Sequence, residues 1–257
     1  MQFSVQMLPG VALVFMLIFA RIGTMLMLMP ALGEGSIPSR VRLSLALILT
    51  MVFFPMAQPL YQVDAASSMP RILQLFAMEF GIGFFIGLGA RMITYALSIA
   101  GLIIANQSGL AFAMATDPTM DGQQGAVIGA FLSLLAVTLI FATNLHYLTI
   151  AAMNDSFRLF PPGGMMPVGD FAQMATDMVG EIFGIAMRIS APFLVVGLVF
   201  YFGLGLLNKL MPQMQIFFIA MPLNIAIGGL MLFALLVTMM MWYLSHFETA
   251  LGRFIAG

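Results

Sequence analysis

Six apolar runs occupy most of this sequence, at residues 8–32, 41–54, 72–105, 126–153, 171–207 and 223–247. Several exceed the roughly 20 apolar residues that a helix needs to cross the hydrocarbon layer of a membrane. Only 7% of the 257 residues are charged, whereas a soluble domain carries about 25%. We therefore expect an all-α membrane-associated protein of long, kinked helices, with one domain over residues 1–257 that contacts membrane lipid.

The charge and the rare residue types exclude several functions. The formal net charge of −1 provides no basic surface for nucleic acid. Cysteine is absent, which excludes disulfides and thiolate metal sites. Residues 1–6 carry no positive charge before the first apolar run, so we expect no cleaved signal peptide. His146 and His246 belong to no spaced ligand cluster, so we expect no metal and no cofactor.

Prolines and glycines predict where the runs end. Pro55 is expected to stop the second run and Pro192 to kink the fifth. We predict a loop over residues 154–169 and a link over residues 208–222. The two runs that this link joins are expected to form a helical hairpin.

The third run is too long for a simple membrane span. As one helix it would extend about 50 Å, against roughly 30 Å of bilayer hydrocarbon. It is therefore tilted, broken near Gly101, or not confined to a bilayer. Lysines and arginines in the connections fall three on each side of six spans, so they do not set an orientation.

A polar, interrupted segment, residues 106–124, separates the third run from the fourth. Glycine and proline break it, yet apolar side chains remain in its centre. Irregular backbone between membrane helices is tolerated where protein buries it or where it lines a water-filled cavity. The residues alone leave two interpretations open, a segment that lines or closes a channel and an exposed connector. The first interpretation would involve Asn106, Gln107, Gly109, Leu110, Phe112, Met114, Asp117, Pro118, Met120 and Gly122.

Placing an ionisable side chain inside an apolar membrane helix costs free energy, so each such residue is a functional candidate. Arg21 has no acid nearby in its own run, so we expect it to pair between helices or with another chain. Four residues of the third run step by four along one helix face, Glu79, Gly83, Gly87 and Arg91. Small residues at this spacing let a second helix approach closely. We predict a helix-packing groove flanked by charges, with an ion or proton pathway as the alternative.

A second charged stripe, formed by Asp177, Glu181 and Arg188, lies in the first half of the fifth run. It could pair with a partner subunit or face a water-filled channel. The glycine-rich stretch GIGFFIGLG follows no strand and has the wrong spacing for a nucleotide fingerprint. Ser108-Gly109 does not complete a Gly-x-Ser-x-Gly nucleophile motif. We therefore expect no enzymatic activity.

Three stretches resemble the flagellar biosynthetic protein FliR family. They are RIGTMLMLMPALGEGSIPSRVRLSLAL at residues 21–47, ANQSGLAFAMATDP at residues 105–118 and LGLLNKLMPQMQIFFIAMPLNIAIG at residues 204–228. The third is the most specific, and together they span nearly the whole chain in the family's order. The sequence departs from the family at Asn144-Leu145-His146, where a glycine is expected before the histidine.

The resemblance implies a structural subunit of the flagellar type III protein export gate. One copy would join FliP and FliQ around a central channel for unfolded flagellar proteins, beside FlhB and FlhA. Residues 1–170 would form a FliP-like part and residues 171–257 a FliQ-like hairpin. The gate would belong to the flagellar basal body in the bacterial inner membrane, raised towards the periplasm. Residues 106–124 would be the loop that plugs the closed channel.

Two other functional classes compete with this interpretation. A secondary transporter or an ion channel acting alone would use Glu79, Glu181 and Arg188. Such transporters often contain inverted repeats, and no repeated motif is visible here. An intramembrane enzyme would need a nucleophile motif that the sequence lacks.

Overall fold

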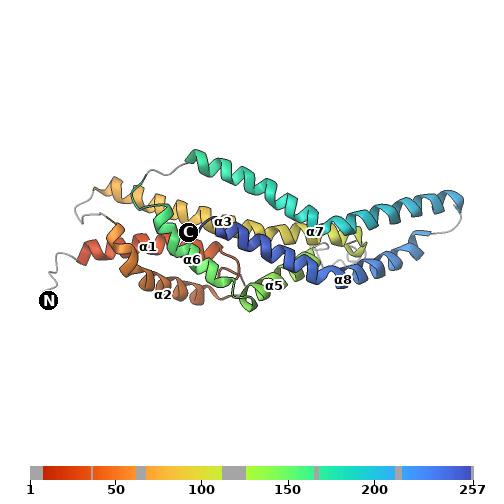
Figure 1. Ribbon diagram of the computed structural model, residues 1–257, viewed down its shortest axis with the longest axis horizontal. Helices are drawn as coiled ribbons and strands as arrows, with labels where there is room; N and C mark the ends of the chain where they lie inside the picture. The colour runs from red at the N-terminus through yellow and green to blue at the C-terminus, as the bar shows by residue number, and fades with distance from the viewer. Residues whose placement is uncertain are drawn as a thin grey trace. The chain divides into compact units, whose positions relative to one another are not determined.

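The computed structural model describes residues 8–35, 37–61, 68–111, 126–164, 168–211 and 216–255, and Figure 1 shows that these segments are mainly helical. These ranges contain no strand. The elements are α1 (Leu8–Leu28), α2 (Ser39–Ala57), the short 3₁₀ helix η2 (Gln58–Leu60), α3 (Met69–Gln107), α5 (Ala126–Ala142), α6 (His146–Leu159), α7 (Val168–Leu210) and α8 (Ile216–Gly252). The expected all-α class is confirmed.

The membrane character of the helices is also confirmed. Five helices of the described part are long and apolar enough to cross a membrane, or six spans result if α5 and α6 count as one broken span. The chain folds as two compact units. The first contains Met1–Met92, Ile140–Met178 and His246–Gly257, and the second contains Ile93–Leu139 and Val179–Ser245.

Helix α1 lies at the centre of the first unit and packs on α2. Its inward side chains are almost fully buried, including Leu17, Ile18, Ile22, Met25 and Leu26. The chain leaves α1 through a tight turn in which Ala31 has φ 70°. A Cβ at Gly33 would lie 2.5 Å from the carbonyl oxygen of Met27, so this turn needs glycine.

The sequence predicted that the second apolar run stops at Pro55, and this prediction is wrong. Helix α2 includes Pro55 and continues to Ala57, followed directly by η2. Proline removes one backbone donor but keeps a helical φ, so a helix end can tolerate it. Packing supplies the compensation, because Phe53 and Ala57 are buried on either side of the proline.

Helix α3 is continuous over 39 residues, so the possible break near Gly101 is excluded. In the second unit, Gly101 instead allows α3 to touch α5. A Cβ at Gly101 would lie 2.3 Å from the Cα of Gly129. The hydroxyls of Ser98 and Ser133 lie 3.2 Å apart along the same contact.

The fourth apolar run is two helices and not one. α5 ends at Ala142 and α6 begins at His146, and Asn144 between them has φ 61°. Asparagine tolerates this left-handed conformation better than most residues. The predicted loop over residues 154–169 also begins too early, since α6 continues to Leu159. Ser156 and Phe157 near that end are buried in the first unit, and this packing keeps the turn helical.

Helices α7 and α8 form the expected hairpin, but their link is shorter than residues 208–222. α7 runs to Leu210, and α8 starts at Ile216 and contains Pro222. α7 also contains Pro192, and Figure 1 shows this helix bent along its length. In the second unit both helices expose large apolar side chains, such as Phe202 at 70% and Phe233 at 84%.

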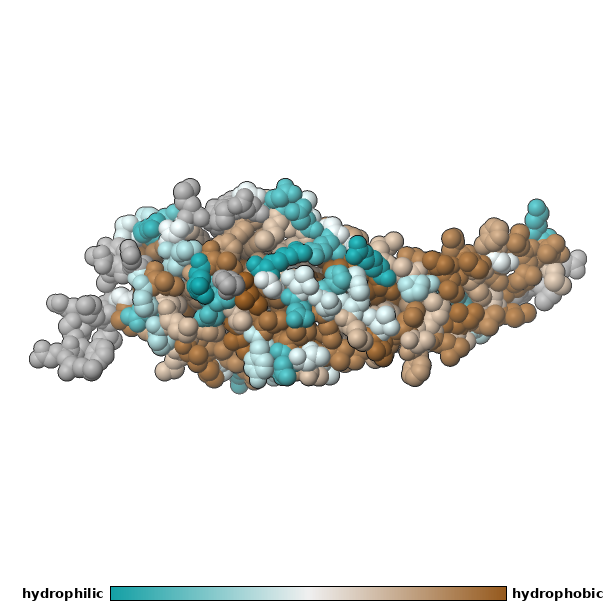
Figure 2. All heavy atoms as spheres, viewed as in Figure 1, coloured by the Kyte–Doolittle hydropathy of each residue, from teal (hydrophilic) through white to brown (hydrophobic). Residues whose placement is uncertain are grey.

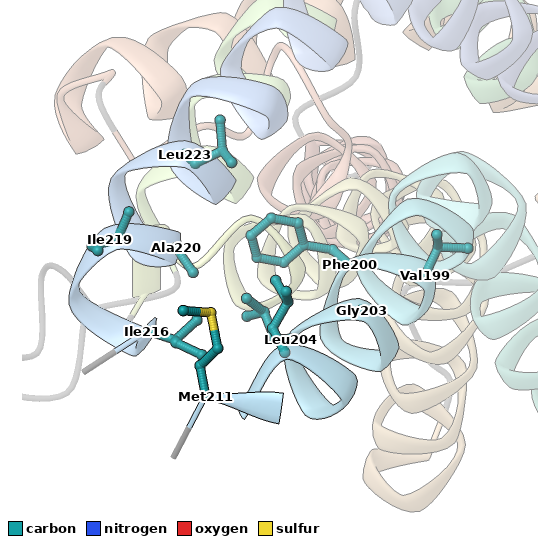
Figure 3. A pocket seen from close by; sticks show the side chains of 10 residues that line it. Val199, Phe200, Gly203, Leu204, Met211, Ile216, Ile219, Ala220 and Leu223 are labelled. Atoms are coloured by element: carbon teal, nitrogen blue, oxygen red, sulfur yellow. The ribbon is translucent and has the colours of Figure 1, made fainter. Parts of the chain in front are cut away.

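Figure 2 shows the visible face of the hairpin's end as almost uniformly hydrophobic. Lipid or partner helices must cover a surface of this kind. Between the two limbs, near the end of the hairpin, lies a cavity of about 390 Å³. Figure 3 shows its lining, in which Phe200 and Leu204 of α7 face Ile216 and Ala220 of α8.

Candidate functional site

The described part of the central segment is its beginning, where α3 ends. α3 stops at Gln107, and Gly109 two residues later has φ 70°. The backbone N–H of Gly109 donates to the carbonyl oxygen of Asn106 at 3.3 Å, which closes a turn. Because Ser108 and Gly109 are buried, this turn belongs to the core of the second unit. We call residues 107–109 the first turn.

Helix α8 holds the first turn through an amide. The Nδ2 of Asn224 donates to the carbonyl oxygen of Gln107 at 3.0 Å. The same nitrogen lies 3.2 Å from the position that a Cβ on Gly109 would take. Asn224 is 5% exposed within a strongly apolar helix, so its amide would be costly without such a partner.

Two glycines form notches that receive the side chains of the first turn. On α8, a Cβ at Gly228 would lie 2.3 Å from the Cβ of Ser108. On α7, a Cβ at Gly197 would lie 2.4 Å from the Oε1 of Gln107. A larger residue at Gly228 would push Ser108 and the first turn away from α8, and one at Gly197 would force the Gln107 side chain to move. The turn is therefore fixed by a hydrogen bond on α8 and by close packing on both limbs.

Two further residues predicted in this segment belong to the described part of the chain. Asn106 and Leu110 flank the first turn, and the Asn106 amide donates to the carbonyl oxygen of Leu102 at 2.7 Å. The remaining predicted residues lie outside the described part of the chain: Phe112, Met114, Asp117, Pro118, Met120 and Gly122.

A second polar site lies in the first unit, where Arg21 of α1 forms a buried ion pair with Glu79 of α3. The Arg21 side chain is fully buried and that of Glu79 is 1% exposed. Arg21 also donates from NH1 to the carbonyl oxygen of Ser156 at 2.9 Å, and its guanidinium lies 4.5 Å from the ring centre of Phe157. This interhelical pairing supplies the partner that α1 itself lacks. One charged side chain thereby connects α1, α3 and α6.

Tyr61, just after η2, completes the surroundings of this pair. Burial raises the pKa of the Tyr61 phenol, and the nearby Glu79 carboxylate adds to that rise. Its hydroxyl makes no hydrogen bond of standard geometry with the described residues. The phenol therefore stays neutral at physiological pH.

The predicted groove between Glu79 and Arg91 receives α1 within the chain. A Cβ at Gly83 would lie 2.5 Å from the carbonyl oxygen of Arg21, and one at Gly87 would lie 2.8 Å from the Cβ of Leu28. Both glycines therefore permit a close helix contact, as small residues do in membrane proteins. Arg91, at the far end of the groove, is half-buried.

The charged stripe of α7 is more exposed than this groove. Asp177 belongs to the first unit, is exposed, and accepts a hydrogen bond from Gln173 at 3.1 Å. Glu181 and Arg188 belong to the second unit, where Glu181 is half-buried and Arg188 is exposed. That this charged stripe contacts a partner subunit remains a prediction. Among the described residues, no group of three side chains could hold a metal ion.

Sequence reasoning missed the three residues that hold the first turn, Gly197, Asn224 and Gly228, and also Ser108 within the turn. Two signals were available. Asn224 places a polar amide side chain inside an apolar run, and burying such a group without a partner costs free energy. Gly228 follows it by four residues, so both lie on one helix face. Nothing in the sequence indicates that Asn224 contacts Gln107, because the two residues are 117 positions apart.

These features define a polytopic all-α membrane protein in which polar contacts join helices distant in sequence. A model of the family described as bacterial export proteins, family 1, matches residues 12–250. The chain therefore belongs to this bacterial export family, the family of the flagellar biosynthetic protein FliR.

Individual relatives agree with this assignment. A flagellar biosynthetic protein FliR of Caulobacter vibrioides is 39% identical over 216 residues, covering 82% of this chain and 84% of that protein. The FliR of Escherichia coli is 31% identical and covers 88% and 85%. Yop proteins translocation protein T of Yersinia pestis is 29% identical and covers 76% and 72%. The chain is thus a component of a bacterial type III export apparatus.

Proposed function

We propose that the chain is a structural subunit of the flagellar type III export gate, and that residues 106–124 plug its channel. One copy joins FliP and FliQ around the channel, beside FlhB and FlhA, and unfolded flagellar proteins pass through. The observation that carries the plug is the buried first turn, fixed to both α7 and α8. An exposed connector would have no need of a buried amide and two glycine notches.

The arrangement of the helices supports a gate that is not an ordinary set of membrane spans. α3 has 39 residues and α7 has 43, lengths of about 60 Å that are twice the bilayer hydrocarbon. We propose that the assembled gate is raised from the inner membrane towards the periplasm, in the flagellar basal body. Residues 1–170 act as the FliP-like part and residues 171–257 as the FliQ-like hairpin.

The rival transporter or channel loses one of its three candidate residues. A transporter or ion channel acting alone would need Glu79, yet this carboxylate is buried in an ion pair with Arg21. Such a pair is suited to holding helices together. We propose that the subunit has no enzymatic role and that the energy for export comes from other components.

Deleting residues 109–122 tests the plug. The gate of this chain with FliP and FliQ should still assemble, and its conductance in a planar bilayer should rise. A second variant replaces the same residues with a Gly-Ser linker of equal length, which keeps the chain length but removes the apolar centre. Leak in both variants supports the plug, and a deletion gate as tight as the unaltered gate contradicts it. The chain purified alone should move neither ions nor solutes.

A further inference from the structure

We propose that Asn224 is a positioning residue for the plug, and that the α7–α8 hairpin is the element whose displacement releases it. This inference rests on the proposed plug function. It adds a specific attachment, formed by Asn224, Gly197 and Gly228, between the hairpin and the first turn.

The attachment combines one directed bond with two steric notches. The Asn224 amide donates to the carbonyl oxygen of Gln107, a backbone atom that has no further residue of α3 to bond. Gly228 and Gly197 accept the side chains of Ser108 and Gln107 so closely that a methyl group could not fit without movement. All three contacts come from the hairpin, and all three reach the first turn. Moving the hairpin must therefore disturb each of them together.

The polar chemistry of the attachment suits a reversible contact. It contains neutral groups only, so separation leaves no buried charge behind. A neutral hydrogen bond changes an equilibrium by roughly two- to tenfold. A gate that opens and closes repeatedly needs contacts of this modest strength.

The hairpin also has room to rearrange. The cavity of about 390 Å³ between its limbs is lined by apolar residues only; Leu223 of that lining directly precedes Asn224 on α8, and Ala220 lies one helical turn before it. Figure 3 shows Ala220 facing Phe200 of the α7 limb across the cavity. The side chains that line the cavity carry no hydrogen-bond donor, so a shift of the limbs against each other would break no hydrogen bond between these side chains. The same shift would move Asn224 relative to the first turn.

The test measures leak through the assembled gate in planar bilayers, together with assembly yield. Gly228→Ala places a methyl group against Ser108, and Asn224→Leu removes the donor at similar volume. Each should raise the closed-state conductance about two- to tenfold while the yield of assembled gate stays unchanged. Gly229→Ala is the matched control, because a Cβ at this neighbouring position would meet nothing within 4 Å. It should leave both quantities unaltered.

A compensating variant separates positioning from general damage. Ser108→Gly removes the side chain that Gly228→Ala would strike, so the double variant should return the leak towards that of the unaltered gate. If Gly228→Ala prevents assembly, Asn224→Leu decides the matter alone. Tight gates for Asn224→Leu and Gly228→Ala, beside a leaking deletion of residues 109–122, would overturn this inference and leave the plug in place. A deletion that does not leak would remove the proposed function itself.

Discussion

The two buried polar sites of this protein use different chemistry for the same task of joining distant helices. In the first unit, Arg21 and Glu79 form a charged pair that connects α1, α3 and α6. In the second unit, the contact between Asn224 and the first turn is made by neutral amide and carbonyl groups. Both are buried, and both bridge residues far apart in the sequence.

The two contacts differ in the free energy that is lost when they are broken. Removing one partner of a buried ion pair costs about 3–5 kcal/mol, because the other charge is left without compensation. A neutral hydrogen bond contributes only about 0.5–1.5 kcal/mol. The charged site is therefore suited to a permanent joint, and the neutral site to a joint that opens.

The largest effect is expected at the charged joint. Arg21→Leu leaves the Glu79 carboxylate buried and unpaired, so the protein should lose about 3–5 kcal/mol of stability and assemble poorly with its partners. The double variant Arg21→Met with Glu79→Leu removes both charges and should recover most of the loss. Yield and thermal midpoint in detergent measure both. An unchanged yield for Arg21→Leu would show that the charged pair is not a joint at all.

A smaller loss is expected where α1 enters the groove of α3. Gly83→Ala would place a Cβ 2.5 Å from the carbonyl oxygen of Arg21, so the helices must separate. Overpacking of this kind costs about 1–3 kcal/mol. Thermal unfolding compares it with Gly184→Ala on α7, where a Cβ would meet nothing within 4 Å. Equal midpoints for the two variants would contradict the close approach of α1 and α3.

A second neutral hydrogen bond in the second unit shows how much stability a contact of this kind contributes. Thr94 of α3 and Tyr243 of α8 are hydrogen-bonded through hydroxyl groups 3.1 Å apart. Thr94→Val should cost about 0.5–1.5 kcal/mol, and less after Tyr243→Phe has removed the partner. A double-mutant cycle of unfolding free energies measures the coupling. A coupling as large as that of Arg21 with Glu79 would erase the distinction between the two kinds of joint.

The smallest effect is expected at Tyr61. Because burial raises its pKa, the neutral phenol contributes stability that is fully present below the ordinary value of about 10 and is lost as pH rises above it. Tyr61→Phe should change stability by less than about 0.5 kcal/mol between pH 7 and 9, since the hydroxyl makes no standard hydrogen bond with the described residues. Thermal midpoints above pH 10 should fall less in the variant. Identical alkaline losses would contradict the burial of the phenol.

The sequence predicted the helices better than it predicted their ends. Pro55 and Pro222 indicated interruptions, yet both lie inside helices, because packing compensates for one missing donor. The break at Asn144 carried no proline or glycine signal, and only its left-handed φ reveals it. Residues 154–159 were assigned to a loop by composition, but the burial of Ser156 and Phe157 keeps them helical.

The sequence predicted two residues of the first turn but not the residues that hold it. Gln107 and Gly109 belong to the polar segment between two apolar runs, which the sequence shows clearly. Asn224 and Gly197 stand in runs where a single amide or glycine has many explanations. Their importance comes from lying against residues more than 80 positions away in the sequence, and local patterns carry no information about such contacts.

The membrane class, the long helices and the family can be predicted from the sequence, because hydrophobicity along the chain and local motifs are sufficient for these. The sequence also required a partner for Arg21, since an isolated guanidinium in an apolar helix is too costly. That the partner is Glu79, and that Asn224 holds the first turn, is visible only in the folded protein. Many helices could have satisfied each polar group, and the choice among them is made by how the helices pack.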